Sequence, residues 1–329
     1  MAKYWLFDFM PKDSMKERWQ IAFGTSEIEF LGTVRDKKKR IYQWIDGANN
    51  ALKSTKNGDT ILCWFDLQAV ILFYLSKLTF RKRKIVAQNI MLKFNSGFKG
   101  RLYKKAYQIA FKSNDFGGTV SSRYYGELLS KELGVKNDFK VVHDQFSEKY
   151  DRFFKEAKDS IEKKYDVFMG GNSSRDWKFG FEIAKMMPDV TFCFILKKEK
   201  LANLGISADD YPNVEIKCNV KLDEFNSDLY SSRIVMCPVT TECPAGLIIM
   251  YTAAAAEILF MSLDTATYKE YVTNDRGEIL PHDATVWKQR IECMLDDDFE
   301  RNRKGKNLHK WLLENCDIET CAKGLYDCF

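Results

Sequence analysis

Residues 166–177 read Asp-Val-Phe-Met-Gly-Gly-Asn-Ser-Ser-Arg-Asp-Trp and lead into a helical pattern over residues 178–187. A strand, a glycine turn and a helix in this order form the repeating unit of α/β folds. Gly170 and Gly171 let backbone N–H groups approach an anion, and Arg175 can make a bidentate contact to phosphate. The alternative is an ordinary strand–helix turn in which Asp176 caps the helix. The segment is neither GxGxxG nor a P-loop, which disfavours a dehydrogenase or a GTPase.

A second strand–helix junction lies at residues 239–247, Val-Thr-Thr-Glu-Cys-Pro-Ala-Gly-Leu. Pro244 is typical of a first helical turn, and Thr241 or Glu242 can cap the helix. Ala245 and Gly246 leave the backbone uncovered, so that a phosphate can lie against the helix N-terminus. The alternative is a buried helix whose small N-terminal residues serve packing alone.

The same alternation of strands and helices extends over both halves of the 329-residue chain. We expect two Rossmann-like domains, 1–150 and 151–305, followed by a helical tail at 306–329. A charged helix over 151–164 is expected near the domain boundary. The predicted strands are 4–9, 60–65, 84–88, 118–120, 139–142, 166–170, 191–196, 214–217, 234–237 and 259–262. The predicted helices are 38–53, 67–78, 98–111, 122–133, 178–187, 222–231 and 245–256.

Five segments of the C-terminal half, in order, resemble the retaining glycosyltransferases of the GT-B fold, in particular the glycosyltransferase family 4-like group (group 1). They are the two junctions above and residues 213–233, 264–272 and 274–281. The resemblance implies an α/β fold of two Rossmann-like domains that face each other across a cleft, with the C-terminal helix returning to the N-terminal domain. It also implies metal-independent transfer of a sugar, with retention, from a UDP- or GDP-sugar. The acceptor would be a saccharide or a lipid-linked saccharide in polysaccharide or glycan biosynthesis, and no cofactor is expected.

The resemblance places the donor nucleotide sugar on the C-terminal domain. Thr252 stands where relatives often carry a ribose-binding Glu, and Glu257 replaces a usual Gly, so a non-catalytic GT-B subunit or a glycan- or partner-binding protein is the alternative. The expected donor-binding residues are Gly170, Gly171, Asn172, Arg175, Lys178, Lys197, Ala245, Gly246, Leu247 and Thr252.

Four residues are the expected catalytic group: Glu242, Arg175, Asp66 and Asn89. Glu242 is expected to bind a sugar hydroxyl, with a helix cap as the alternative. Asp66 and Asn89 follow predicted strands of the N-terminal domain, whose carboxyl ends should face the cleft. Asn89 stands where related enzymes often place a His, which argues against a His base. The alternative for Asp66 is an N-cap on the helix that follows it.

Positive charge is concentrated in the N-terminal half. Residues 1–150 hold 27 Lys and Arg against 15 Asp and Glu, and residues 77–112 hold eleven basic residues and no acidic one. Such a segment favours a polyanionic partner. In the predicted helix 98–111, Lys99, Arg101, Lys104 and Lys105 are expected to face an anionic membrane or the acceptor. A solvated face is the alternative, and nucleic acid is disfavoured because no stacking module accompanies the charge.

The chain is expected to be cytoplasmic, and peripheral at the inner face of the cell membrane. The N-terminus lacks the pattern of a signal peptide, and the apolar stretch 245–263 carries Glu257 in its middle. The nine cysteines are scattered without CxxC spacing or a neighbouring His, so reduced thiols are expected and a metal site is not.

Overall fold

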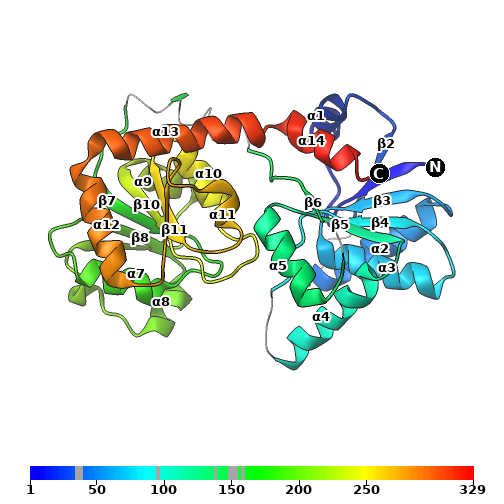
Figure 1. Cartoon of the computed structure of the whole chain (residues 1–329), viewed down its shortest axis with the longest axis horizontal. Helices are drawn as coiled ribbons and strands as arrows, with labels where there is room; N and C mark the ends of the chain where they lie inside the picture. Colours follow the sequence, from blue (N-terminus) through cyan, green and yellow to red (C-terminus); the bar gives the residue numbers. More distant parts are fainter. Residues whose placement is uncertain (34–39, 94–96, 137–138, 147–154, 157–159) are drawn as a thin grey trace. The chain divides into compact units, whose positions relative to one another are not determined.

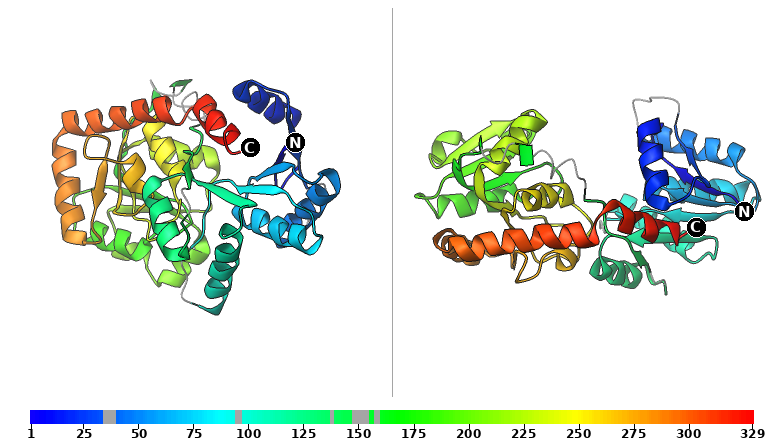
Figure 2. Two further views of the ribbon diagram at one scale, coloured as in Figure 1. Left: turned by 45° about the vertical axis from the view of Figure 1, so that its right-hand side comes forward. Right: turned by 90° about the horizontal axis from the view of Figure 1, so that it is seen from above.

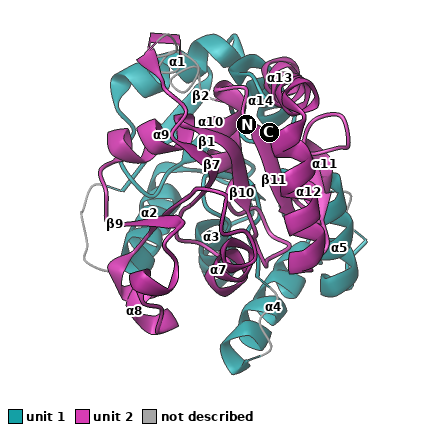
Figure 3. Ribbon diagram, turned by 90° about the vertical axis from the view of Figure 1, so that its left-hand side faces the viewer, with its two compact units in different colours: residues 1–145, 316–329 teal, residues 146–315 magenta. Residues whose placement is uncertain are grey.

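The computed structural model describes residues 1–33, 40–93, 97–136, 139–146, 155–156 and 160–329 (Figure 1). The chain forms two compact units, Met1–Gln145 with Cys316–Phe329 as unit 1, and Phe146–Asn315 as unit 2 (Figure 3). Each unit is built on a sheet with helices on both of its faces (Figure 2). Among the described residues, no helix combines the length and the apolar composition needed to span a bilayer.

The sheet of unit 1 has six parallel strands in the order β2-β1-β3-β4-β5-β6. Its strands are β1 (Lys3–Leu6), β2 (Ile28–Leu31), β3 (Thr60–Cys63), β4 (Lys84–Ala87), β5 (Phe116–Val120) and β6 (Lys140–Val141). Its helices are α1 (Asp13–Phe23), α2 (Arg40–Ser54), α3 (Asp66–Leu78), α4 (Phe98–Phe111), α5 (Arg123–Leu133) and α14 (Ile318–Tyr326).

Helix α14 confirms the expected return of the C-terminus to the N-terminal unit. It packs against α1, and Leu325 joins the buried cluster of Trp5, Trp19 and Leu62. Lys140 of β6 forms an ion pair of 2.8 Å with Asp327 just beyond the helix. After unit 2 the chain therefore returns to unit 1, and its last helix packs into the core of that unit.

Unit 2 repeats the parallel design with the order β12-β11-β10-β7-β8-β9. Its strands are β7 (Tyr165–Gly170), β8 (Phe192–Leu196), β9 (Val214–Cys218), β10 (Ser232–Cys237), β11 (Leu259–Leu263) and β12 (Glu278–Leu280). Its helices are α7 (Trp177–Lys185), α8 (Lys198–Leu204), α9 (Leu222–Tyr230), α10 (Leu247–Ala255), α11 (Tyr268–Tyr271), α12 (Ala284–Asp296) and α13 (Asp298–Asn315), with a 3-10 turn at Ala208–Asp210.

Several elements differ from the sequence predictions. The strand β2 and the helices α1, α8 and α11 were not predicted, nor was the edge strand β12. The expected boundary between 305 and 306 falls inside the continuous helix α13, because its buried positions continue through Leu308 and Leu312. The predicted helix 151–164 lies largely outside the described residues, and 161–164 are not helical.

Candidate functional site

The topology of unit 2 places two loops at one switch point. The chain passes from β7 outward to β8 and β9, then returns to β10 on the other side of β7. Open parallel sheets bind ligands at the carboxyl ends of the strands where this reversal occurs. Those ends are Gly170 and Cys237, and the loops that follow them are the two junctions singled out from the sequence.

The two junctions are joined directly by backbone contacts. Arg175 and Val239 form an antiparallel bridge, and the N–H of Thr240 donates to the carbonyl of Ser174 at 3.0 Å. The N–H of Asp176 donates to the carbonyl of Pro238 at 2.9 Å. Loops 64 residues apart in sequence therefore act as one platform.

Arg175 lies at the centre of this platform. Its Nε donates to the carbonyl of Gly170 at 3.1 Å and its Nη1 to that of Ser173 at 2.8 Å, which fixes the guanidinium plane. A Cβ atom added to Gly246 would lie 2.8 Å from Nη2 and 2.9 Å from Nη1, and one added to Gly171 would lie 3.1 Å from Nη2. The structure therefore brings together three of the predicted donor-binding residues from the two loops.

Gly246 is the N-cap residue of α10, with φ 82°, and no side chain caps this helix end. The first-turn N–H groups of α10 and its partial positive charge are therefore next to the Arg175 guanidinium. The predicted start of the helix is wrong by two residues, because Ala245 and Pro244 precede the N-cap. Pro244 is thus outside the first turn, and neither Thr241 nor Glu242 caps the helix.

A third loop, after β11, supports the second junction. The carboxylate of Glu242 accepts a hydrogen bond from the N–H of Ala266 at 2.6 Å, and the carbonyl of Glu242 accepts one from Thr267 Oγ1 at 2.7 Å. The buried hydroxyl of Tyr268 donates to the carbonyl of Ala245 at 2.9 Å. Burial raises the Tyr268 pKa well above its usual value, so the hydroxyl stays protonated and able to donate. Sequence reasoning missed this support: residues 264–272 were singled out as one segment of the family resemblance, without a structural role.

Asp176 caps α7, as the alternative reading of the first junction proposed. Its Oδ1 accepts from the N–H of Phe179 at 3.1 Å, while its Oδ2 lies 3.0 Å from Nε2 of His282. The His282 ring stacks on Phe179 with centroids 4.2 Å apart. His282, which is isolated in sequence, thus belongs to the support of the α7 N-terminus.

Three further predicted donor residues lie at the same edge of the sheet. Asn172 in the first loop and Lys178 in the first turn of α7 are exposed. Lys197 follows the carboxyl end of β8, is exposed, and is the N-cap residue of α8. Leu247, the first residue of α10, is buried, so only its backbone N–H is suited to an anion.

Thr252 differs from its expected role. It is 1% exposed, and its hydroxyl donates to the carbonyl of Ile248 at 2.8 Å, one turn earlier in α10. A side chain that is enclosed and already hydrogen-bonded has no surface to offer a ribose, so the structure gives the predicted contact no support. Glu257, with φ 56°, follows the helix and lies 3.6 Å from Nδ1 of His309.

In unit 1, Asp66 is buried and hydrogen-bonded within the fold. Its carboxylate accepts from the N–H of Leu67 at 2.7 Å and from that of Met91 at 2.8 Å, and Tyr107 adds a hydrogen bond from α4. Asp66 is the first residue of α3 and not its N-cap, which is Phe65. Burial raises the Asp66 pKa. With 6% exposure, this carboxylate joins three segments and is not positioned to touch a substrate.

Asn89 marks the carboxyl end of β4 and adopts a left-handed backbone with φ 48°. Its N–H donates to Thr119 Oγ1 at 2.9 Å, and its Nδ2 donates to Asp144 Oδ1 at 2.8 Å. Burial raises the pKa of Asp144 to about 6, against the opposing effects of His143 and Asn89. The pair Asn89–Asp144 was not predicted, because 55 residues separate its members.

The four cations predicted to face a membrane or the acceptor on α4 do not all have the same environment. Lys99, Arg101 and Lys105 are exposed, whereas Lys104 forms an ion pair of 2.8 Å with Glu132 of α5. Apolar side chains are exposed beside these three exposed cations, Phe98 at 76% and Leu102 at 60%. Lys104 therefore serves helix packing, and the other three remain available to a partner.

No model of a known protein family matches the chain, and no curated protein matches it in sequence. HepE of Anabaena, in complex with UDP, matches the structure with a TM-score of 0.69 at 11% identity, covering 99% of each chain. Sucrose-phosphate synthase of Thermosynechococcus elongatus has a TM-score of 0.75 at 10% identity, covering 99% of this chain and 98% of the other. The glycosyltransferase WaaG has a TM-score of 0.65 at 10% identity, covering 99% of each chain. The chain therefore has the GT-B fold that these glycosyltransferases share.

Proposed function

We propose that the protein is a glycosyltransferase that takes a sugar from a nucleotide diphosphate and transfers it to a saccharide or lipid-linked acceptor. The observation that carries this proposal is the approach of the Arg175 guanidinium to Gly246 at the uncapped N-terminus of α10. A fixed cation and free backbone N–H groups at a sheet switch point suit a diphosphate. UDP is the preferred nucleotide, since the HepE structures contain UDP or UDP-glucose.

In this proposal the diphosphate is the leaving group. Its negative charge increases as the bond to the sugar breaks, and Arg175 with the N–H groups of Leu247 and Ile248 would stabilise that charge without a metal. Glu242, held by Ala266 on the edge of the second junction, is suited to accept a hydrogen bond from a sugar hydroxyl. Transfer with retention is part of the proposal, and rests on the sequence resemblance alone.

The acceptor is proposed to be held by unit 1 at a cytoplasmic membrane face. The exposed Lys99, Arg101 and Lys105 beside Phe98 and Leu102 combine charge with apolar surface on one helix. This combination is typical of helices that lie on anionic membranes. WaaG, one of the structural neighbours, is a glycosyltransferase involved in lipopolysaccharide biosynthesis.

A non-catalytic nucleotide- or glycan-binding GT-B protein is the second candidate, and the enclosed Thr252 favours it. Titration calorimetry with UDP, followed by assay of UDP-sugar turnover, distinguishes the two. We expect UDP binding in the wild type and a loss of about tenfold or more in Arg175→Gln, which removes a charge-assisted contact. Lys185→Gln, an exposed change at the far end of α7, is the matched control. Binding without turnover or hydrolysis supports the second candidate. Absence of UDP binding contradicts transfer from a UDP-sugar and leaves only a glycan- or partner-binding GT-B protein.

A further inference from the structure

A pocket lies in unit 2 at the opposite edge of the sheet from the donor platform. Its volume is about 510 Å³, within the usual range for small-molecule sites. It is lined by residues at the amino-terminal ends of three strands: Lys163 before β7, Arg233 in β10 and Ile258 before β11. Arg301 and Lys306 of α13 line it as well. The pocket is therefore separate from the carboxyl-end loops that carry Arg175 and Gly246.

Positive charge dominates the lining. Four cations, Lys163, Arg233, Arg301 and Lys306, face two carboxylates, Glu257 and Asp298. Both carboxylates have partners of their own, since Asp298 pairs with Arg301 and Glu257 lies 3.6 Å from His309. The pocket thus carries an excess of two positive charges.

Among the residues that the structure describes, three of these cations are not held by a short ion pair. Arg233 has one ion pair, to Asp166 at 3.7 Å, and no ion pair of Lys306 occurs among the described residues. Lys163 donates to the carbonyls of Tyr230 and Ser232, at 2.9 and 2.7 Å, which are neutral acceptors. These groups can therefore accept an anion without breaking a strong ion pair.

The pKa of Lys163 is lowered to about 8, first by burial and then by the neighbouring positive charges of Arg301 and Arg233. Of the lining groups, Glu257, Asp298 and Lys306 also contribute charge around it. An anion bound near these cations would offset their positive charge and would raise the pKa of Lys163 toward its usual value.

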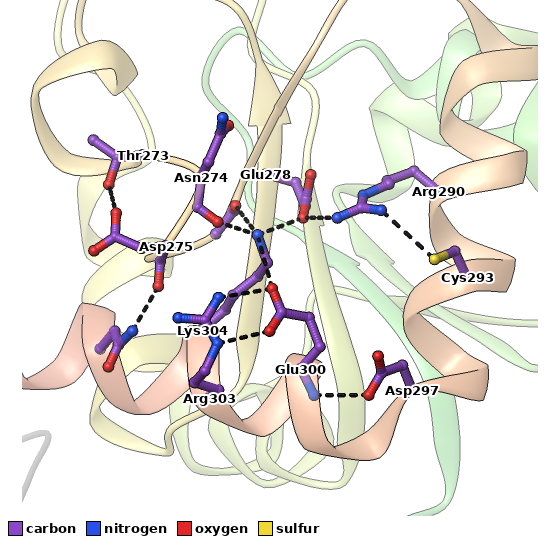
Figure 4. Close-up of polar contacts among 12 residues, drawn as sticks. Thr273, Asn274, Asp275, Glu278, Arg290, Cys293, Asp297, Glu300, Arg303 and Lys304 are labelled. Carbon is purple, nitrogen blue, oxygen red and sulfur yellow. Dashed lines mark hydrogen bonds and ion pairs between the residues drawn. The ribbon is translucent and has the colours of Figure 1, made fainter.

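The α13 wall of the pocket is held firmly by the neighbouring face of the same helix (Figure 4). Lys304, 3% exposed, donates to the carbonyl of Asn274 and pairs with Glu278 at 2.9 Å. Arg290 of α12 pairs with the same carboxylate oxygen of Glu278 at 2.7 Å. Arg301 itself donates to the carbonyl of Met294 at 2.8 Å. The cations of α13 are thus presented from a fixed helix, which lowers the ordering cost of binding.

We propose that this pocket is a second anion site, which binds a small phosphate-bearing metabolite independently of the donor nucleotide. Its size suits a sugar phosphate or a diphosphate, and its cations can supply hydrogen bonds to several phosphate oxygens. This inference does not depend on the proposed transferase activity, because it uses another edge of the sheet.

The test is titration of the full chain with inorganic pyrophosphate, in the presence of saturating UDP so that the donor platform is occupied. We expect a binding isotherm with one site, weakened about tenfold or more in Arg233→Gln and in Lys306→Gln. Lys185→Gln, whose side chain is exposed and outside the pocket, should bind as the wild type does. Binding of equal strength in all four proteins would mean general attraction to positive charge and would overturn the proposal, as would no binding at all.

Proton uptake supplies a second readout. At pH 8 about half of Lys163 is deprotonated, so an anion that raises its pKa should draw protons from the buffer. Calorimetry in two buffers of different ionisation enthalpy measures that uptake. Pyrophosphate also exchanges protons when it binds, so the uptake due to Lys163 is the difference between proteins: we expect more net uptake in the wild type than in Lys163→Met. Saturable pyrophosphate binding with the same net proton exchange in the wild type and in Lys163→Met would place the anion away from Lys163, and would contradict the proposal even if binding were tight.

Discussion

The guanidinium of Arg175 occupies the space that a side chain on Gly246 would need, with Nη2 2.8 Å from the Cβ position. The hydroxyl of Tyr268 lies 2.6 Å from the same position. Glycine at 246 is therefore required twice, once by φ 82° and once by these two neighbours. The relationship joins the β7 and β10 loops in one anion-binding platform.

We predict that Gly246→Ala weakens UDP binding by about tenfold or more, because the new methyl group displaces Arg175 from the α10 N-terminus. Left-handed backbone alone costs an L-residue about 1–2 kcal/mol of stability. Gly205→Ala is the matched control, since Gly205 has φ 65° and no atom within 4 Å of its Cβ position. Calorimetry with UDP and thermal unfolding are measured on both. Equal UDP affinity in the two variants would show that Arg175 is not part of the site.

Lys304→Met is predicted to lower the free energy of unfolding by about 3 kcal/mol. The change leaves Glu278, which is 7% exposed, with Arg290 as its remaining cation, and removes a donor from the loop at Asn274. Breaking one member of a buried ion pair typically costs about 3–5 kcal/mol. Urea denaturation measures the loss.

The control for this prediction lies on the same helix. Lys310 is 76% exposed and lies 3.9 Å from Glu314, so Lys310→Met should change stability by less than about 0.5 kcal/mol. If both substitutions have the same small effect, the buried pair contributes little net stability, as replacement of such pairs by apolar groups sometimes shows.

The sequence predicted the platform but not its support. The βα junctions at 170–176 and 239–247 carry their signal locally, in glycines between a strand and a helix, and the structure brings Arg175, Gly171 and Gly246 together. The contacts of Glu242 with Ala266, and of Tyr268 with Ala245, join segments about 24 residues apart across a strand and a helix. Contacts of this kind produce no periodic pattern in the sequence from which they could be predicted.

The roles of individual polar residues near the strand ends and in the helices that follow them were the least predictable from sequence. Asp66 and Thr252 have the residue types of ligand-binding groups, yet the fold encloses both and uses their oxygens on its own backbone or side chains. Whether such a residue is buried depends on which helix covers it. Asp66 is covered by α4, whose Tyr107 forms a hydrogen bond with its carboxylate. A single sequence contains little information about that coverage.

The raised pKa of Asp144, about 6, predicts a stability that falls as pH rises. Between the unfolded value near 4 and the folded value, the native state binds more protons than the unfolded state, so unfolding becomes easier toward pH 6. The free energy of unfolding should fall by at most about 3 kcal/mol and should level off above pH 6. Chemical denaturation of the wild type and Asp144→Asn from pH 4 to 7 measures it. A wild-type slope that Asp144→Asn does not reduce would assign the pH dependence to other groups.

Helix α4 presents exposed cations and apolar side chains that suit an anionic membrane. We expect the chain to float with vesicles that contain anionic phosphatidylserine, because Lys99, Arg101 and Lys105 are exposed beside Phe98 and Leu102. Each cation near such a surface is worth about 1 kcal/mol, so replacing all three by Gln should reduce partitioning about a hundredfold.

A matched triple substitution of Lys12, Lys53 and Lys56 by Gln removes the same charge from exposed positions elsewhere in unit 1. It should leave most of the partitioning intact if the helix face is the binding surface. Lys104→Gln should also have little effect at the membrane, because Glu132 already neutralises Lys104, but it should loosen the packing of α4 on α5. Equal losses in the two triple variants would mean that net charge, and not α4, determines binding. Unchanged flotation after the α4 substitutions would contradict a membrane role for this helix, and the acceptor would then have to be sought among soluble saccharides.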